Sequence, residues 1–459
     1  MFPAVLIAMT TSARAIDIPH EQYQLSNGLN VILHEDHQLP QVVVNLWYGV
    51  GSKDEVPGRS GFAHLFEHLM FMGTVHLPGS GFDERMEAYG GWNNAWTSED
   101  ATDYYEAGPS NLLQTFLWLE ADRMRDLGRA MTQEKLEIQR GVVRNERRQG
   151  VEDTPYGIVW EALNPALYPP EHPYGHTVIG SHEDLVAATL DDVTGFFSTW
   201  YVPNNASLVI AGDFDPAQAR AWVEQYFGGI AQKALPERRS VPPVDGPVVP
   251  LREETDNVTV PMTLMTWHTP PALQPGDADY DLVASVLGDG TASRLYDRLV
   301  MKDKIAVEVE AWNYSQLLSS VFGVSFKPAE GHTLEQIEEV VLEEIARLAA
   351  EGPTEAELER AMNQIEVGFI QGLEGLHSRA SALNRYRYLA GDPGYANQDL
   401  LRYRGLGAAE VKAAAARLTA ERASRIRVRP RAAAPETTEA PETETTEAPE
   451  TTEEQGEKK

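Results

Sequence analysis

Residues 61–74 read GFAHLFEHLMFMGT and carry His64, Glu67 and His68 in the order His-x-x-Glu-His. An α-helix turns by about 100° per residue, so on a helix Glu67 and His68 lie about 60° and 40° from His64, on one face. Two imidazoles one turn apart can bind a single metal ion, and a carboxylate beside them can take a proton from water bound to that ion. The spacing therefore predicts a zinc-dependent hydrolytic site on a helix.

The predicted helix is apolar almost all round. Its apolar residues are Phe62, Leu65, Phe66, Leu69, Met70 and Phe71. A pair of histidines one turn apart can also belong to an ordinary solvated face. A glutamate among so many apolar residues is expected to be partly buried, however, and buried glutamate is rare unless it is paired or binds a ligand. The composition of the helix favours the metal site.

A zinc hydrolase needs a third protein ligand and an open fourth position. The chain has no cysteine, so the third ligand must be a distant His, Asp or Glu. A second predicted helix, at about residues 133–149, carries three candidates, Glu134, Glu137 and Glu146. Spacing alone does not choose among them.

Several further motifs accompany the histidine motif. They are residues 27–29 (NGL), 90–105 (GGWNNAWTSEDATDYY), 142–149 (VVRNERRQ), 172–185 (HPYGHTVIGSHEDL), 201–215 (YVPNNASLVIAGDFD) and 290–296 (GTASRLY). With them the chain, over about residues 20–430, resembles the pitrilysin family of zinc peptidases, the inverzincins. Insulin-degrading enzyme and mitochondrial processing peptidase are relatives in this family, and the chain looks like its short, two-domain bacterial type.

The resemblance implies a zinc metalloendopeptidase that hydrolyses peptides or small unfolded proteins. It implies one Zn²⁺ per chain, with His64, His68 and Glu146 as ligands and Glu67 as the catalytic base. Asn94 and Ala95 match the edge strand on which family members bind substrate as an added β-strand, and such backbone pairing depends little on side chains.

Two departures from the family pattern bear on activity and assembly. Gln139 stands seven residues before Glu146, where the family often has a second glutamate. Active members are built from four such domains, and the distal half supplies an Arg and a Tyr to the substrate. Residues 319–326 (SSVFGVSF), which should hold that arginine, contain none. The resemblance therefore implies a homodimer, or a heterodimer with a zinc-free paralogue that supplies both residues.

The alternative is a non-catalytic structural or assembly subunit of a peptidase-like complex. Such subunits typically lose residues of the zinc motif, and here all four key positions are intact. An enzyme acting on a non-peptide substrate has no sequence feature in its favour.

The remaining sequence indicates an α+β fold of two homologous domains, each a mostly antiparallel sheet covered by helices, together half of a clamshell. Asn27-Gly28 predicts a hairpin turn, and β-rich runs lie at residues 41–50 and 91–105. Helices are expected at residues 111–126, 189–200 and 216–227, and the order of elements repeats after residue 250, with strands at residues 258–266, 305–314 and 320–326 and helices at 279–287, at 292–300 and from 354.

Composition sets the proposed boundaries. Residues 16–234 are expected to form the N-terminal zinc-binding catalytic domain, residues 235–250 a Pro-rich linker and residues 251–431 the homologous C-terminal domain. Residues 432–459 consist mainly of Glu, Thr and Pro and should be disordered. Residues 1–15 hold a short apolar run followed by Ala-Arg-Ala, as at the end of a signal peptide, which predicts a periplasmic or otherwise exported protein, with a cytoplasmic one as the alternative.

The 459 residues carry 38 basic and 69 acidic side chains, a net charge of -31. Nucleic acid is therefore an unsuitable partner, because phosphate binding needs clustered Lys and Arg. The tail contributes nine Glu and two Lys, or -7, so the body carries -24 and is expected to favour basic peptides. No apolar run is long enough to predict a membrane-spanning helix.

Overall fold

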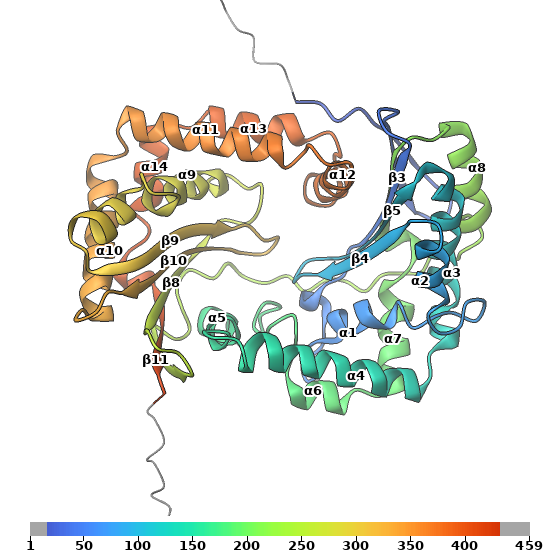
Figure 1. Cartoon of the computed structure of the whole chain (residues 1–459), viewed down its shortest axis with the longest axis horizontal. Coiled ribbons are helices and arrows are strands. Elements are labelled where there is room, and N and C mark those ends of the chain that lie inside the picture. The colour runs from blue at the N-terminus through green and yellow to red at the C-terminus, as the bar shows by residue number, and fades with distance from the viewer. Residues whose placement is uncertain (1–15, 432–459) are drawn as a thin grey trace, which may run out of the picture.

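The computed structural model describes residues 16–431, so the expected signal peptide and the acidic tail both lie outside the described residues. Within that range the chain forms two β-sheets with helices packed around them (Figure 1). The expected α+β fold class is confirmed. None of the helices in residues 16–431 combines the length and the apolar character needed to cross a bilayer.

The two sheets are built from consecutive parts of the chain. The first contains β1 (Glu21–Gln24), β2 (Asn30–Glu35), β3 (Gln41–Tyr48), β4 (Trp92–Thr97), β5 (Thr102–Pro109) and β6 (Ala206–Gly212). The second contains β7 (Leu251–Asp256), β8 (Met262–Thr269), β9 (Ala306–Tyr314), β10 (Ser320–Pro328) and β11 (Ser424–Pro430). Their strand orders are β1-β2-β6-β3-β5-β4 and β7-β11-β8-β10-β9.

Apart from β1, the two sheets have the same connectivity. In each, the first strand lies parallel to the last, β2 beside β6 and β7 beside β11, and the other neighbours are antiparallel. The duplication expected from element order is therefore present in the strand topology, and the sheets are mostly antiparallel, as expected.

The helices of the first half are α1 (Phe62–Leu69), α2 (Gly81–Glu87), α3 (Leu113–Ala130), α4 (Gln133–Arg147), α5 (Ile158–Leu167), α6 (His182–Ala187), α7 (Leu190–Trp200) and α8 (Pro216–Phe227). Those of the second half are α9 (Asp277–Gly288), α10 (Leu334–Glu351), α11 (Glu355–Gln371), α12 (Leu376–Ala390), α13 (Ala396–Arg404) and α14 (Ala408–Ala415). Thr189 and Thr354 form the capping boxes that start α7 and α11, because each threonine hydroxyl accepts an N–H of the first turn that has no partner inside the helix.

Each sheet is covered on one face by helices of its own half and on the other by a helix of the opposite half. Helix α12 packs Ala380 and Leu383 against Val43 and Val209 of the first sheet. Helix α5 does the same for the second sheet, where its residues pack on Leu264, Ile426 and Val428. Figure 1 shows α12 beside β3 and α5 beside the strands of the second sheet. The two halves are interlocked through these helices.

Some local expectations differ from the structure. The strand expected at residues 258–266 begins at Met262, and β7 precedes it directly after the Pro-rich segment. The helix expected over residues 292–300 is a π-helical turn at Tyr296–Lys302. Strand β7 escaped prediction because its residues, LREETD, are mostly charged and lack the apolar alternation of a half-buried strand.

Candidate metal centre

Helix α1 is fixed at its N-terminus by a carboxylate from outside the helix. Both oxygens of buried Glu55 accept backbone N–H groups, from Gly61 at 3.0 Å and Ala63 at 2.7 Å. Burial raises the pKa of Glu55 well above its ordinary value, although the amide hydrogen bonds oppose that shift. On the apolar face of α1, buried Leu65 and Phe66 pack into the core of the first half. The packing of the apolar face and the hydrogen bonds to Glu55 together fix the orientation of the opposite face of α1.

That opposite face carries His64 and His68, and it meets Glu146 on α4. The Nε2 atoms of the two histidines lie 3.3 Å apart. Glu146 Oε2 lies 3.7 Å from His64 Nε2 and 3.1 Å from His68 Nε2. The structure therefore brings together the three residues expected as ligands, from two helices that are about 80 residues apart in sequence.

These separations match those of ligands that share one zinc ion. Ligand atoms about 2.0–2.1 Å from zinc in a tetrahedral arrangement lie about 3.4 Å from one another. The three observed distances are 3.1, 3.3 and 3.7 Å. Two nitrogens and one carboxylate oxygen also form a donor set that zinc commonly has in catalytic sites. The residues present fit the ion.

Glu146 faces the histidines although three arginines lie near it in sequence. Those arginines contact other groups: Arg144 contacts His182, Arg147 pairs with Glu161, and Arg148 contacts Asn145. In the part of the chain that the structure describes, His64 and His68 are the only Lys, Arg or His side chains within ion-pair distance of the Glu146 carboxylate. Its carboxylate is therefore available to a cation.

The two other glutamates considered for the third position do not join this group. Glu137 lies about two and a half turns before Glu146 and pairs with Arg140 at 2.6 Å. Glu134 is one turn further away, and neither is among the residues that converge on the histidines. Gln139, where the family often has a second glutamate, directs its amide to the sulfur of Met72 at 2.7 Å.

Glu67 lies beside the histidines and contacts the end of β4. Its Oε2 accepts a hydrogen bond of 2.5 Å from the hydroxyl of Thr97. Burial raises the pKa of Glu67 to about 7, with the charge of Glu146 adding to the shift and the Thr97 hydrogen bond opposing it. Burial, and to a lesser extent His68, lowers the pKa of His64 to about 4, which keeps its imidazole neutral. A neutral imidazole is the form that binds a metal ion.

Strand β4 lies at the end of the first sheet and pairs on one side with β5. Asn94 is exposed, and its Oδ1 accepts a hydrogen bond of 2.9 Å from the backbone N–H of Ala95. A strand at a sheet edge presents backbone groups to any added strand. In β4, the backbone N–H of Ala95 is bound by the side chain of Asn94, which can rotate away.

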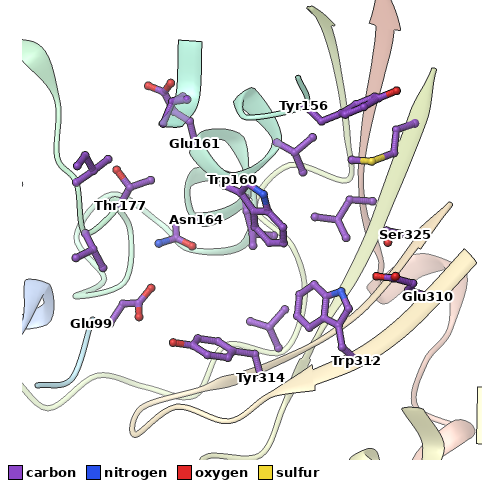
Figure 2. Close-up of a pocket in the computed structure, with 18 of the residues that line it drawn as sticks. Glu99, Tyr156, Trp160, Glu161, Asn164, Thr177, Glu310, Trp312, Tyr314 and Ser325 are labelled. Atoms are coloured by element: carbon purple, nitrogen blue, oxygen red, sulfur yellow. The ribbon is translucent and has the colours of Figure 1, made fainter. Parts of the chain in front are cut away.

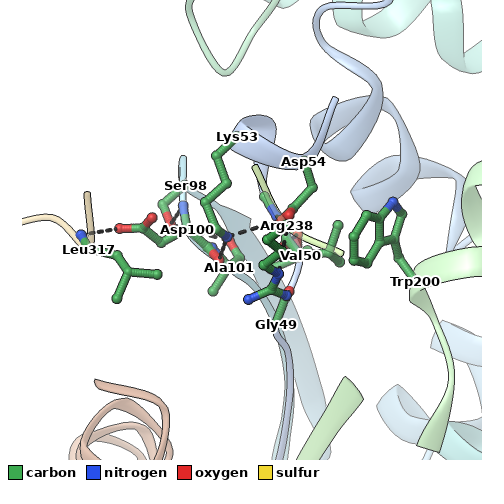
Figure 3. A network of polar contacts seen from close by, with 12 residues as sticks. Gly49, Val50, Lys53, Asp54, Ser98, Asp100, Ala101, Trp200, Arg238 and Leu317 are labelled. Atoms are coloured by element: carbon green, nitrogen blue, oxygen red, sulfur yellow. Dashed lines mark hydrogen bonds and ion pairs between the residues drawn. The ribbon is translucent and has the colours of Figure 1, made fainter. Parts of the chain in front are cut away.

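The turn that follows β4 is anchored to both halves (Figure 3). The backbone oxygen of Asp100 accepts hydrogen bonds from the Lys53 ammonium at 2.5 Å and the Tyr388 hydroxyl at 2.9 Å. Its carboxylate accepts the N–H of Leu317 at 2.8 Å and the Tyr174 hydroxyl at 2.6 Å. The position of the edge strand therefore depends on contacts from the second half.

Comparisons with known proteins agree with this geometry. Residues 30–180 match the family described as Insulinase (Peptidase family M16), and residues 187–365 match the Peptidase M16 inactive domain. The chain belongs to peptidase family M16. The M16 match to residues 30–180 includes all four residues of the candidate site.

Individual relatives in family M16 are also named as zinc proteases. The chain is 28% identical over 359 residues to the zinc protease PqqE of Helicobacter pylori, which covers 77% of this chain and 80% of that protein. It is 25% identical over 376 residues to the uncharacterized zinc protease YmxG of Bacillus subtilis, covering 81% and 88%. A crystal structure of a protease from Helicobacter pylori superposes with a TM-score of 0.84 at 25% identity, covering 90% of this chain and all of that one.

Sequence reasoning missed two residues of this centre, Glu55 and Thr97. Glu55 lies in a loop before the helix, and no spacing rule links a loop carboxylate to a helix that begins seven residues later. Thr97 was visible as part of the edge strand, but its contact with Glu67 depends on how β4 crosses α1. The resemblance to a family named the expected ligands and the expected base but gave no information on the residues that support them.

A second cluster, of His76, Asp122 and Asp126, has different geometry. His76 Nδ1 lies 2.6 Å from Asp122 Oδ1, which is a hydrogen-bond distance and too short for two ligands of one ion. Asp126 also pairs with Arg129 at 3.0 Å. This cluster is an ion-pair network within the first half.

Proposed function

We propose that this chain is a zinc-dependent metalloendopeptidase that hydrolyses peptides or small unfolded proteins. The observation that carries the proposal is the convergence of His64 Nε2, His68 Nε2 and Glu146 Oε2 at separations that suit one ion, one per chain. The zinc protease names of the M16 relatives agree with it.

Glu67 is the general base in this proposal. When bound, zinc lowers the pKa of water and polarises a carbonyl group, which is the chemistry that peptide hydrolysis needs. Glu67 receives the proton of the attacking water on its carboxylate and returns it to the leaving amine. A group that acts first as a base and then as an acid must be able both to take up and to release the proton, and burial raises the pKa of Glu67 toward the range in which it can do both. The Thr97 hydroxyl holds the carboxylate in position while this happens.

Substrate binds as an added strand along β4, with Asn94 and Ala95 in contact with its backbone. The free edge of the sheet supports this proposal, as does the exposed side chain of Asn94. Strand addition derives its affinity from main-chain hydrogen bonds, so the site accepts many sequences, provided that the peptide is extended. Most backbone groups of a folded protein are already paired within its own helices and sheets, which disfavours folded substrates.

The rival function, a non-catalytic assembly subunit, has one observation in its favour, the "inactive domain" description of the match to residues 187–365. That match runs from the end of α6 through α7, β6 and α8 into the second half, and it includes none of His64, Glu67, His68 and Glu146. Because the chemistry depends on these four residues, we favour the enzyme.

We further propose that the protein is exported and works as a dimer. Export is supported by the apolar run and the Ala-Arg-Ala sequence within residues 1–15. A heterodimer with a zinc-free paralogue, or failing that a homodimer, is supported by the absence of arginine from residues 319–326. Size-exclusion chromatography with light scattering, followed by peptidase assays with and without the paralogue, tests the assembly.

The function is tested by metal analysis and a fluorogenic-peptide assay on the purified chain. We expect about one zinc per chain and cleavage that a chelator abolishes and added zinc restores. A chain that binds zinc and cleaves none of a varied peptide set, alone or with its paralogue, would favour the assembly subunit instead.

A further inference from the structure

A cavity of about 750 Å³ lies between the first half and the second sheet. Helix α5 forms one wall, and strands β8, β9 and β10 form the opposite wall (Figure 2). The volume is within the range of sites that bind small molecules or peptide side chains.

Aromatic side chains from both halves project into this cavity. Trp160 of α5 and Trp312 of β9 face each other with ring centroids 6.3 Å apart, as Figure 2 shows. Trp160 is 56% exposed and Tyr314 is 50% exposed, although both point into the hollow. Met262 and Leu264 of β8 extend the apolar surface. Exposed aromatic groups gathered in a hollow are typical of a ligand site.

The charged residues of the described lining are all acidic, and two of the four form an ion pair with a basic side chain. The described lining has four carboxylates and no Lys or Arg, the carboxylates being Glu99, Glu161, Glu308 and Glu310. Arg147 pairs with Glu161, and Lys327 lies 2.9 Å from Glu308. Burial raises the pKa of Glu99, so this carboxyl holds its proton more readily than an exposed one. Two of the four carboxylates, Glu161 and Glu308, therefore have a basic partner, and the rest of the described lining is mainly apolar and aromatic.

The cavity is adjacent to the candidate metal centre along two segments of the chain. Glu99 lines the cavity and lies two residues after Thr97. Thr97 in turn contacts Glu67. Glu161 pairs with Arg147, the neighbour of Glu146 in sequence. A peptide that runs along β4 past Thr97 therefore reaches the cavity within a few residues, since a strand rises about 3.3 Å per residue.

We propose that this cavity binds a large apolar side chain of the substrate, aromatic ones best, and so determines which bonds are cleaved. The proposal rests on the proposed peptidase function. A substrate ring can pack against Trp160 and Trp312 in the offset or edge-on arrangements that aromatic rings favour. The net charge of the whole chain predicts a preference for basic peptides, whereas the aromatic and apolar lining of this cavity predicts a preference for apolar side chains.

The test uses peptides that are identical except for Phe, Ala, Arg or Asp at one position, with that position moved along the peptide. Binding is measured by fluorescence anisotropy to zinc-loaded Glu67→Gln protein, and cleavage is measured with the wild type. At one position we expect the Phe peptide to bind at least about tenfold more tightly than the Ala peptide, because an aromatic side chain is buried there. The Arg peptide should bind no better than the Ala peptide, and the Asp peptide should bind worst.

Trp160→Ala in the Glu67→Gln background should remove the Phe preference. Met301→Ala is the matched control, because Met301 is 58% exposed and lies outside the cavity. Equal binding of the Phe and Ala peptides, or tighter binding of the Arg peptide, would overturn the proposal.

The two readouts separate this inference from the proposed function. If the Phe preference depends on Trp160 but the wild type cleaves none of the peptides, the cavity assignment stands and the peptidase function fails. If the wild type cleaves all four peptides equally well and none is bound preferentially, the function stands and the cavity assignment fails.

Discussion

The hydroxyl of Thr97 donates a hydrogen bond of 2.5 Å to Oε2 of Glu67, which joins the last residue of edge strand β4 to the centre of helix α1. One end of this contact belongs to the strand proposed to bind the substrate backbone, and the other to the proposed base. A peptide aligned on β4 is thereby in register with Glu67.

Replacing Thr97 with valine should lower kcat/KM about tenfold, because a hydrogen bond to a charged group is lost in a partly buried site. Thr97→Ser keeps the hydroxyl and should retain most of the activity. Steady-state assays of both variants measure the effect. If the valine and serine variants were equally impaired, the hydroxyl would not be the cause.

Glu67→Gln should keep its zinc and lose at least about 10²-fold in kcat, which is the usual contribution of a general base. The amide has the same size as the carboxylate but cannot accept the proton. Metal analysis and kinetics on the same preparation separate the two effects. Near wild-type turnover in this variant would rule out the proposed base.

Glu146→Gln should weaken zinc binding, since an amide is a poorer ligand than a carboxylate. Glu134→Gln and Glu137→Gln are matched controls on the same helix and should leave the zinc content near one per chain. Zinc stoichiometry after dialysis against a weak chelator distinguishes them. Loss of zinc from either control, with Glu146→Gln unaffected, would contradict the ligand assignment.

Arg123→Leu should destabilise the protein by about 3–5 kcal/mol, because it leaves buried carboxylates without a counter-ion. Arg123 is fully buried and binds Glu120 at 2.7 Å and Glu106 at 3.1 Å. Arg129→Leu is the control on the same helix. The Arg129 side chain is 76% exposed and pairs with Asp126, so its loss should cost about 1 kcal/mol or less. Urea unfolding of both variants measures the difference.

Glu357→Gln should destabilise the protein at pH 7 but not at pH 2. The hydrogen bonds from Arg294, at 2.7 Å to each oxygen, lower the pKa of Glu357 to about 2. A lowered carboxyl pKa contributes stability that is fully present above the unfolded-state pKa, about 4.3, and is lost as the pH falls through about 2. Solvent screening at this partly exposed pair limits the effect to about 1 kcal/mol. Unfolding free energies of wild type and variant should converge as the pH is lowered; a constant difference would contradict the assignment.

The sequence predicted those features that depend on local pattern. The His-x-x-Glu-His helix, the starts of helices α7 and α11 and the strands on either side of Asn27-Gly28 are all where spacing and turn chemistry indicate. Gly28 has φ of +87°, a conformation that glycine adopts without strain.

Features that depend on contacts distant in sequence were beyond such reasoning. Spacing alone left Glu134, Glu137 and Glu146 equivalent, because the choice depends on how α4 packs against α1. The crossing of α5 and α12 to the opposite sheets was equally invisible, since an amphipathic helix shows that it has an apolar face but not which sheet covers it. Glu55 and Thr97 were missed for the same reason.

The reciprocal packing of α5 and α12 means that the Pro-rich segment is not a point at which the protein can be divided. A fragment that ends before residue 250 would lack α12 and expose Val43 and Val209 to water, and a fragment that begins there would lack α5 and expose Ile426 and Val428. A protease that nicks residues 235–250 should accordingly leave two pieces that co-purify. The two halves should also melt in one cooperative transition. Two halves with the same strand order, apart from β1, are thereby expected to fold as a single unit.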